Sequence, residues 1–320
     1  MDESNSKATI LSMAVLAGSA AVLLHEGLGH GVTAWVRGLT VTELTSNHLS
    51  TLQNDHWVEA GGTLVNLAAG LLSLVAGQRL AKGANARYFL WLLAALNLLP
   101  AAGYFMLSGI FNFGDWAAVI GDLPHKGFVR IGMTLIGAGA YYGFMLLLAI
   151  AIRPFVRNQR DYTAIARLPY LAAGVFSCVA GAFDPLGLHL MLISTIPAAF
   201  GGSSGMLWAD AFLPRTVPET VLRVGRQPVW WVLAIVLGAA FIWFWGAVFG
   251  LHLEDRSAFP PLSPFPSFRP YRLCLWAIRD RRGRSGWRRS RSEADRCRRC
   301  GTCGENRRAV RDRCPSWRCH

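Results

Sequence analysis

Long apolar runs follow one another along residues 1–252. A helix that crosses a membrane needs about 20 mostly apolar residues, and the runs lie at about 8–36, 57–78, 88–112, 127–152, 165–183, 186–206 and 227–250. The fifth and sixth runs are short and are interrupted by Pro185 and Pro197, so the pattern predicts six or seven spanning helices. The first run does not fit a signal peptide, because its leading segment is not basic. We expect an all-α, polytopic protein integral to the cytoplasmic membrane of a prokaryote.

Composition supports this expectation and charge divides the chain in two. Hydrophobic residues make up 52% of the chain and charged residues 16%. Residues 1–252 contain 14 Lys and Arg against 12 Asp and Glu, whereas residues 253–320 contain 18 Arg, no Lys and 7 acids. The net charge of +13 therefore belongs to the tail, and we expect no nucleic-acid partner for the body. The predicted organisation is a transmembrane domain, 1–252, followed by a Pro- and Arg-rich tail, 253–320.

The tail shows neither helical nor strand periodicity. We expect it to be disordered, or to be the product of an out-of-frame reading of a GC-rich gene. The spacing of Cys297, Cys300 and Cys303 leaves a structural zinc knuckle open as an alternative.

Basic residues in the links between runs predict the orientation of the helices. The links at about 79–87 and 153–167 carry half of the 14 Lys and Arg of the body, so both should face the cytoplasm. The N-terminus is then inside, and the segments near 38–56 and 113–126 are outside. A seventh span would place the Arg-rich tail outside as well, against the same rule.

Three ionisable side chains lie within six positions of the first run: His25, Glu26 and His30. An ionisable residue inside a span costs at least about 2.5 kcal/mol, which makes it a functional candidate. Two His flanking a Glu form the core of the zincin signature, in which the imidazoles bind Zn²⁺ and the Glu deprotonates the metal-bound water. A polar patch that packs helices together is the alternative interpretation.

The spacing of the two histidines requires a distorted helix. Residues five apart point about 140° from each other on a regular α-helix, so His25 and His30 could not reach one metal ion. A π-bulge reduces the angle to roughly 50°, and Gly27 and Gly29 make this distortion inexpensive. The motif therefore predicts a π-helical turn around Glu26.

A catalytic zinc ion normally has three protein ligands, so a third must come from elsewhere. Asp115 is favoured, because it lies in an apolar, Gly-bearing segment where an unpaired carboxylate would be costly. Its alternative role is a helix N-cap. The other candidate ligands are Asp122, Glu59, His48 and His56.

Three segments, in order, resemble motifs of the site-2 protease family of intramembrane zinc metalloproteases. They are His25-Glu26 with His30, Gly62-Thr63-Leu64-Val65-Asn66, and Asn97-Leu98-Leu99-Pro100 followed by an Asp. The resemblance implies zinc held by His25, His30 and Asp115, with Glu26 as the general base and Asn66 orienting an unwound substrate. It also implies that the partners are membrane protein or peptide substrates within the lipid bilayer.

The departures from the family pattern are the extra residue between the histidines, Thr63 in place of Pro, and the longer distance from Asn97 to Asp115. Two other functions remain open. A different membrane metallohydrolase would use the same cluster, and a carrier would use it as an ion-binding site. Asn66 could also form an interhelical hydrogen bond within a face of small residues.

Overall fold

The computed structural model describes residues 4–184, 187–216, 218–248, 278–279 and 285–286. The chain divides into two units, Met1–Ala258 and Phe259–His320. In the second unit, the described residues form strands β3 (Ile278–Arg279) and β4 (Ser285–Gly286), which pair antiparallel. The predictions of disorder, of a changed reading frame and of a cysteine knuckle concern residues outside the described ones.

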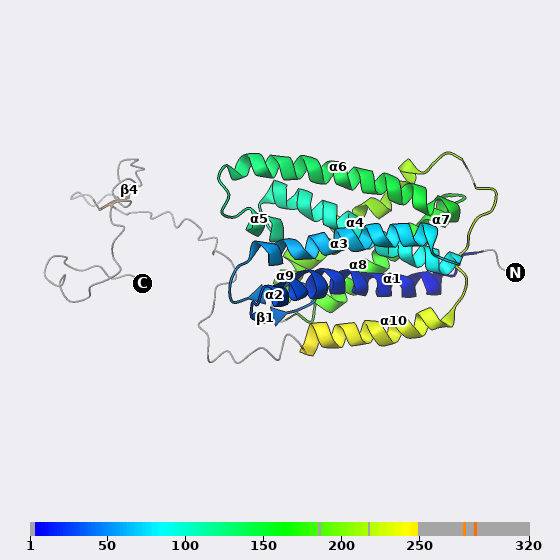
Figure 1. The fold of residues 1–320 in the computed structure, drawn as a ribbon, viewed down its shortest axis with the longest axis horizontal. Coiled ribbons are helices and arrows are strands. Elements are labelled where there is room, and N and C mark those ends of the chain that lie inside the picture. Colours follow the sequence, from blue (N-terminus) through cyan, green and yellow to red (C-terminus); the bar gives the residue numbers. More distant parts are fainter. Residues whose placement is uncertain (1–3, 185–186, 217, 249–277, 280–284, 287–320) are drawn as a thin grey trace. The chain divides into compact units, whose positions relative to one another are not determined.

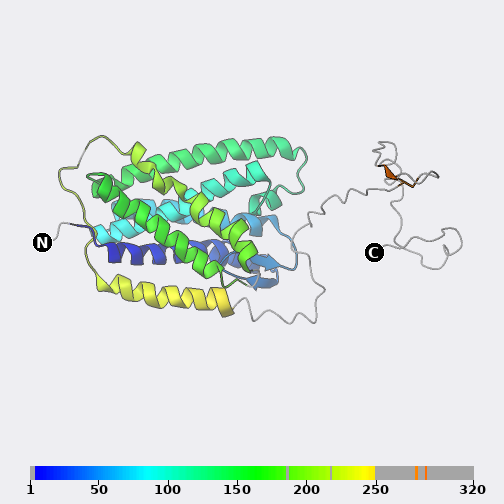
Figure 2. The same cartoon turned by 180° about the vertical axis from the view of Figure 1, so that it is seen from behind.

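Among the described residues of the first unit, six helices are long and apolar enough to cross a membrane. They lie side by side as a bundle (Figures 1 and 2). The first combines α1 (Lys7–Val22), η1 (Leu23–Val32) and α2 (Thr33–Val36); then come α3 (His56–Arg79), α4 (Ala84–Phe111), α6 (Lys126–Ile152) with η2 (Arg153–Phe155), α7 (Gln159–Tyr162) with η3 (Thr163–Arg167) and α8 (Leu168–Gly181), and α10 (Pro228–Phe241) with η8 (Ile242–Val248). This number agrees with the predicted six or seven and indicates a multi-pass membrane protein.

The apolar run predicted at 186–206 is not one regular helix. It forms short pieces: α9 (Gly187–Leu190), η4 (Met191–Thr195), η5 (Pro197–Gly202), η6 (Ser204–Leu207) and η7 (Ala209–Phe212). Pro197 has no amide hydrogen to continue the helical ladder, which explains the break before η5. Thr195 donates to Asn47 at one end of the bundle, and Arg167 donates to the Leu207 carbonyl at the other. The segment from α9 to η7 therefore runs from one end of the bundle to the other without forming a regular helix.

Helix α4 lies at the centre of the bundle and packs on α1, α3 and α6. Tyr88 and Trp91 on this helix are buried, and they donate to the carbonyls of Ile165 (2.8 Å) and Leu148 (3.0 Å). Buried polar groups inside a membrane need such partners, since no water is available there. These bonds tie α4 to η3 and α6 and hold the bundle core in register.

A β-hairpin corrects the all-α expectation. Strands β1 (Val41–Leu44) and β2 (Leu49–Thr51) pair antiparallel between the first and second spans. The strands contain the β-branched residues Val41, Thr42 and Thr51, which favour extended structure. A short helix, α5 (Asp115–Val119), follows α4 on the same end of the bundle (Figure 1).

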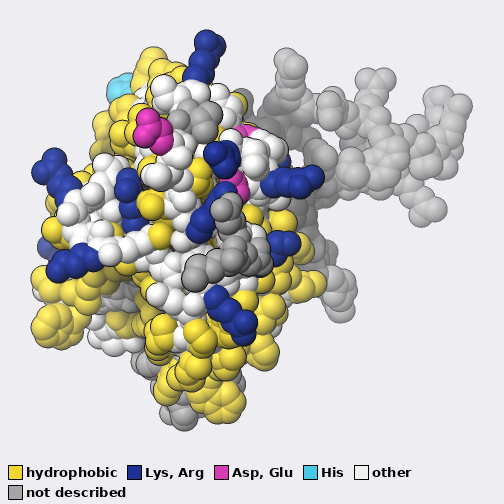
Figure 3. Space-filling model, turned by 90° about the vertical axis from the view of Figure 1, so that its right-hand side faces the viewer, with side chains coloured by type: hydrophobic (Ala, Val, Ile, Leu, Met, Phe, Trp, Pro, Cys, Tyr) yellow, Lys and Arg dark blue, Asp and Glu magenta, His cyan; other side chains and the backbone are white. Residues whose placement is uncertain are grey.

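Charged side chains distinguish the two ends of the bundle. Figure 3 shows the end where α3 and α6 finish and α10 begins, and Lys and Arg side chains predominate there. Those on the links and helix ends include Arg79, Lys82, Arg87, Arg157, Arg160, Arg223 and Arg226. By the positive-inside rule we expect this end to face the cytoplasm. The hairpin and α5 would then face outward.

The hairpin is attached to the bundle through His48. Its Nε2 lies 3.2 Å from Glu43 Oε2 and its Nδ1 lies 3.7 Å from the buried Asp184 Oδ2. Asn47 also donates to Asp184 (3.1 Å). Burial lowers the pKa of His48, but the two carboxylates outweigh it and raise the pKa to about 9.

This pKa predicts a loss of stability in alkali. A raised pKa contributes stability that is complete below the unfolded value of 6.5 and is lost as pH rises to about 9. The contribution is of the order of 2–3 kcal/mol. We expect the thermal midpoint in detergent to fall more between pH 6.5 and 9.5 for the wild type than for His48→Gln. Equal pH dependence of the two proteins would contradict the attachment.

Candidate metal centre

The His-Glu motif lies on a π-helix, as predicted. The segment η1 spans Leu23–Val32 inside the first membrane helix. Its wider turn brings the His25 and His30 rings to a centroid distance of 4.8 Å with an edge-to-face orientation. On a regular α-helix, His25 and His30 would point in different directions because they are five residues apart. The π-helical backbone brings their side chains together.

Hydrogen bonding sets which nitrogen of His30 is free. His30 Nδ1 lies 2.6 Å from the carbonyl oxygen of Val58 on α3. A carbonyl can only accept, so Nδ1 donates its proton and the neutral ring keeps the Nε2 lone pair. Metal-bound histidines are commonly oriented in this way. His30 is thus ready to act as a ligand through Nε2.

Three glycines allow η1 and α3 to approach closely. A Cβ atom on Gly29 would collide with the backbone of Gly61 and Gly62, and a Cβ on Gly61 would collide with Gly29. A Cβ on Gly62 would lie 2.5 Å from His30 Nε2 and 2.7 Å from His25 Nε2. Gly62 therefore keeps open the space directly in front of both imidazole nitrogens. This gives the Gly62–Asn66 motif a physical role next to the histidines.

The structure brings Asp115 to both histidines. Asp115 Oδ2 lies 3.5 Å from His25 Nε2 and 3.4 Å from His30 Nε2. After α4, Asn112 and Gly114 adopt positive φ angles of 54° and 79° and turn the chain back over the site. Gly114, not Asp115, is the N-cap of α5, so the alternative role of Asp115 is not observed.

The electrostatics of Asp115 suit a ligand. Burial opposes ionisation, but the two imidazoles that face this carboxyl, His25 and His30, hold its pKa well below its ordinary value. The carboxylate is therefore ionised over the range in which proteins function.

Tyr104 holds Asp115 in place and was not identified from the sequence. The Tyr104 hydroxyl donates to Asp115 Oδ1 and accepts from the Asp115 amide, both at 3.3 Å. Tyr104 lies on α4, eleven positions before Asp115. No sequence spacing predicts a contact between a helix residue and a carboxylate that follows the next turn.

We predict that Tyr104→Phe weakens metal binding without abolishing it. Removal of a group that orients a ligand typically costs 10- to 100-fold in metal affinity. Chelator competition measures this directly, with Tyr142→Phe as the control because Tyr142 is 52% exposed on α6. Unchanged affinity in Tyr104→Phe would show that Asp115 does not depend on this hydroxyl.

Glu26 is buried beside the histidines with an unsatisfied oxygen. Its side chain is 6% exposed, and Oε2 has no hydrogen-bond partner within the part of the chain that the structure describes. His25, Glu26 and His30 offer ligand atoms that all lie within 4.8 Å of one another, a group that could hold a metal ion. Together with Asp115, the cluster thus contains two histidines and two carboxylates. One carboxylate could be a metal ligand and the other could transfer protons.

The other candidate ligands lie elsewhere or further from the nitrogens. His56 pairs with Asp122 at 3.4 Å, and both are exposed. His48 is held by Glu43 and Asp184. Glu59 lines the same cavity as the cluster, but only Asp115 pairs with both histidines among the described residues.

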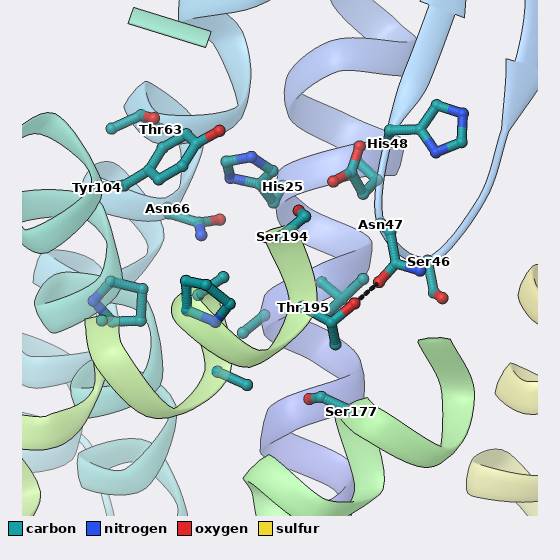
Figure 4. A pocket seen from close by; sticks show the side chains of 18 of the residues that line it. His25, Ser46, Asn47, His48, Thr63, Asn66, Tyr104, Ser177, Ser194 and Thr195 are labelled. Atoms are coloured by element: carbon teal, nitrogen blue, oxygen red, sulfur yellow. Dashed lines mark hydrogen bonds between the residues drawn. The ribbon is translucent and has the colours of Figure 1, made fainter. Parts of the chain in front are cut away.

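A cavity of about 590 Å³ opens from the cluster into the bundle. Figure 4 shows Thr63, Asn66 and Tyr104 on one side of it and Ser46, Asn47 and His48 of the hairpin on the other. Asn66 is buried, and its Oδ1 finds no partner in the described part of the chain. The interhelical hydrogen bond that was the alternative role of Asn66 is therefore not observed for this oxygen.

Two distances within the donor set are close to those found around a small tetrahedral cation. Two ligand atoms at the usual zinc distances lie about 3.3 Å apart around a tetrahedral ion. Both N···O distances to Asp115 are close to this value, and both exceed the normal length of an N–H···O hydrogen bond. The arrangement is therefore better suited to ligands that share an ion than to direct hydrogen bonds.

The site is described from the structure alone, because the comparisons with known proteins found no match. The described residues hold a buried His/Glu/Asp cluster, set on a π-helix and open to a cavity in the bundle. No family model matches the chain, and no match is found among curated proteins or among solved structures.

Proposed function

We propose that the chain is an intramembrane zinc metalloprotease that hydrolyses peptide bonds in or near transmembrane segments. The observation that carries the proposal is the unpartnered, buried Glu26 carboxylate beside His25 and His30, with Asp115 facing both histidines. A buried carboxylate without a partner is costly. Its retention next to three metal-ligand side chains is explained by a role in proton transfer.

His25, His30 and Asp115 would hold the zinc ion, which supplies a Lewis acid and lowers the pKa of a bound water. Glu26, through its unpartnered Oε2, would act as the general base and then as the general acid toward the leaving amine. Tyr104 keeps Asp115 aligned through its hydroxyl. His25, Glu26 and His30 lie within the first candidate membrane helix.

The groups around the cluster favour a peptide as the substrate. Asn66 Oδ1 and Thr63 Oγ1 are buried, line the cavity and lack partners among the described residues. A peptide that unwinds in a membrane exposes amide hydrogens and carbonyls that need such partners. Asn66 would accept a hydrogen bond from the substrate backbone and so fix its register at the site.

The proposal is tested by reconstituting the purified full chain in liposomes with single-span peptides of different sequence. We expect at least one peptide to be cut, with products identified by mass, and cleavage to stop with a chelator and return with Zn²⁺. Metal-dependent release of fatty acids from the liposome lipids, without peptide cleavage, would instead assign the cluster to a lipid hydrolase. Neither activity in zinc-loaded protein would overturn the proposal.

A further inference from the structure

The cavity continues beyond the metal cluster into an apolar half. Gly18, Ala21 and His25 all line it from one face of the first helix. Seven residues separate Gly18 from His25, which corresponds to about 10 Å along a helix. On α8, Ala173, Ser177 and Ala180 line the cavity with matching spacing, and Figure 4 places Ser177 at the side away from Thr63 and Tyr104.

The inner end of this half is closed by contacts between small residues. A Cβ atom on Gly18 would lie 3.5 Å from Ala173 Cβ, and one on Gly202 would lie 3.0 Å from the Pro100 backbone. We call this part the apolar lobe, and its walls are Gly18, Ala21, Pro100, Ala173, Ser177 and Ala198. Because these side chains are short, this part of the cavity leaves room for an apolar side chain between the helices.

Unpaired polar groups lie on the cavity wall as well. Ser46, Thr63 and Asn66 each have a buried side-chain oxygen without a partner in the described ranges, and each residue lines the cavity. An acyl chain would leave all three oxygens without a hydrogen bond, and each unsatisfied oxygen would reduce the binding free energy. A peptide satisfies them with its backbone while it places an apolar side chain between the helices. The combination therefore favours a peptide over a lipid.

We propose that the apolar lobe is a side-chain subsite that selects a bulky apolar residue, such as Phe or Leu, beside the bond that is cut. The proposal rests on the proposed proteolytic function. The lobe, not the metal cluster, would then determine which transmembrane sequences are substrates. Ser177 and Ala198 are its specificity-determining positions, since both line the cavity and a larger side chain at either one would extend into the lobe.

The test uses blocked amino acids that differ only in side chain and metal-binding group. N-acetyl-phenylalanine and N-acetyl-alanine hydroxamates are titrated into zinc-loaded protein, and the corresponding carboxamides into chelator-treated protein. The matched variants are Ser177→Leu in the lobe and Val175→Leu, which is on the same helix but 57% exposed on the outer surface. If Ser177→Leu does not fold, Ala198→Leu is used instead, because it also places a larger side chain in the lobe.

We expect the wild type and Val175→Leu to prefer the phenylalanine probe, and Ser177→Leu to lose roughly tenfold or more of that preference. Its zinc content and its affinity for the alanine hydroxamate should stay unchanged. The subsite would be overturned if the wild type bound the phenylalanine and alanine hydroxamates equally. It would also be overturned if Ser177→Leu and Val175→Leu changed the preference equally. Tighter, lobe-dependent binding of octanohydroxamate would overturn it in favour of an acyl-chain site.

The two proposals fail in different ways. If hydroxamates bind no better than carboxamides but Ser177→Leu still removes the phenylalanine preference, the metalloprotease function fails, and the lobe remains only as a binding pocket for an apolar side chain. If hydroxamates bind through the metal but without side-chain preference, the function stands and the subsite fails.

Discussion

Substitution of Glu26 by Gln is expected to leave zinc bound and to remove peptide cleavage. Gln has nearly the same shape as Glu but cannot accept a proton from the metal-bound water. General acid–base catalysis contributes about 10²- to 10⁴-fold, so the rate in liposomes should fall by that factor. Zinc content should remain at about one ion per chain, as for the wild type.

The zinc measurement in this variant separates two roles of Glu26. The residue lies within the group of ligand atoms that could hold an ion, together with His25 and His30. If Glu26→Gln loses its zinc, Glu26 is a ligand and the base must be sought elsewhere. If the variant keeps both zinc and activity, the buried carboxylate has no catalytic role. Asp122, in the exposed turn after α5, offers a control: Asp122→Asn should change neither the zinc content nor the cleavage rate.

Substitution of Gly62 by Ala is expected to abolish metal binding. The new methyl group would lie 2.5 Å from His30 Nε2 and 2.7 Å from His25 Nε2. No Cβ approaches other atoms this closely, so at least one imidazole must turn away, and zinc binding by the remaining groups should be lost. Zinc content after gentle purification should fall from about one ion per chain to near zero.

A matched glycine tests whether this effect is local. Gly139 lies in the α6 span, and a Cβ there would meet no atom within 4 Å. Gly139→Ala should keep its zinc and the wild-type thermal midpoint. Because overpacking in a core costs about 1–3 kcal/mol, Gly62→Ala should still form the bundle, which circular dichroism in detergent can show. A folded Gly62→Ala protein with full zinc would contradict the arrangement at the histidines.

Features that depend on nearby residues could be predicted from the sequence. Apolar run length predicted six or seven spans, and six candidate spans are found among the described residues, because a membrane fixes the length of a helix that crosses it. The five-residue spacing of His25 and His30, with glycines between them, predicted the π-helix. Asp115 was preferred among five candidates on the cost of a carboxylate in an apolar segment, and it is the one that faces both histidines.

Features that depend on contacts distant in the sequence could not be predicted in this way. The clearance provided by Gly62 depends on how α3 packs against η1. Tyr104 reaches Asp115 only because positive φ angles at Asn112 and Gly114 reverse the chain. The apolar lobe forms where α8 and η5 meet the first helix, and no local pattern places these segments together.

The central claim is that His25, His30 and Asp115 hold one zinc ion within the membrane bundle. It is tested most directly by the zinc content of the detergent-purified protein, measured by mass spectrometry beside His30→Ala, Asp115→Ala and the control Asp122→Ala. We predict about one zinc per chain in the wild type and the control, and almost none in the other two variants. No zinc in the wild type, or full zinc in Asp115→Ala, would contradict this account.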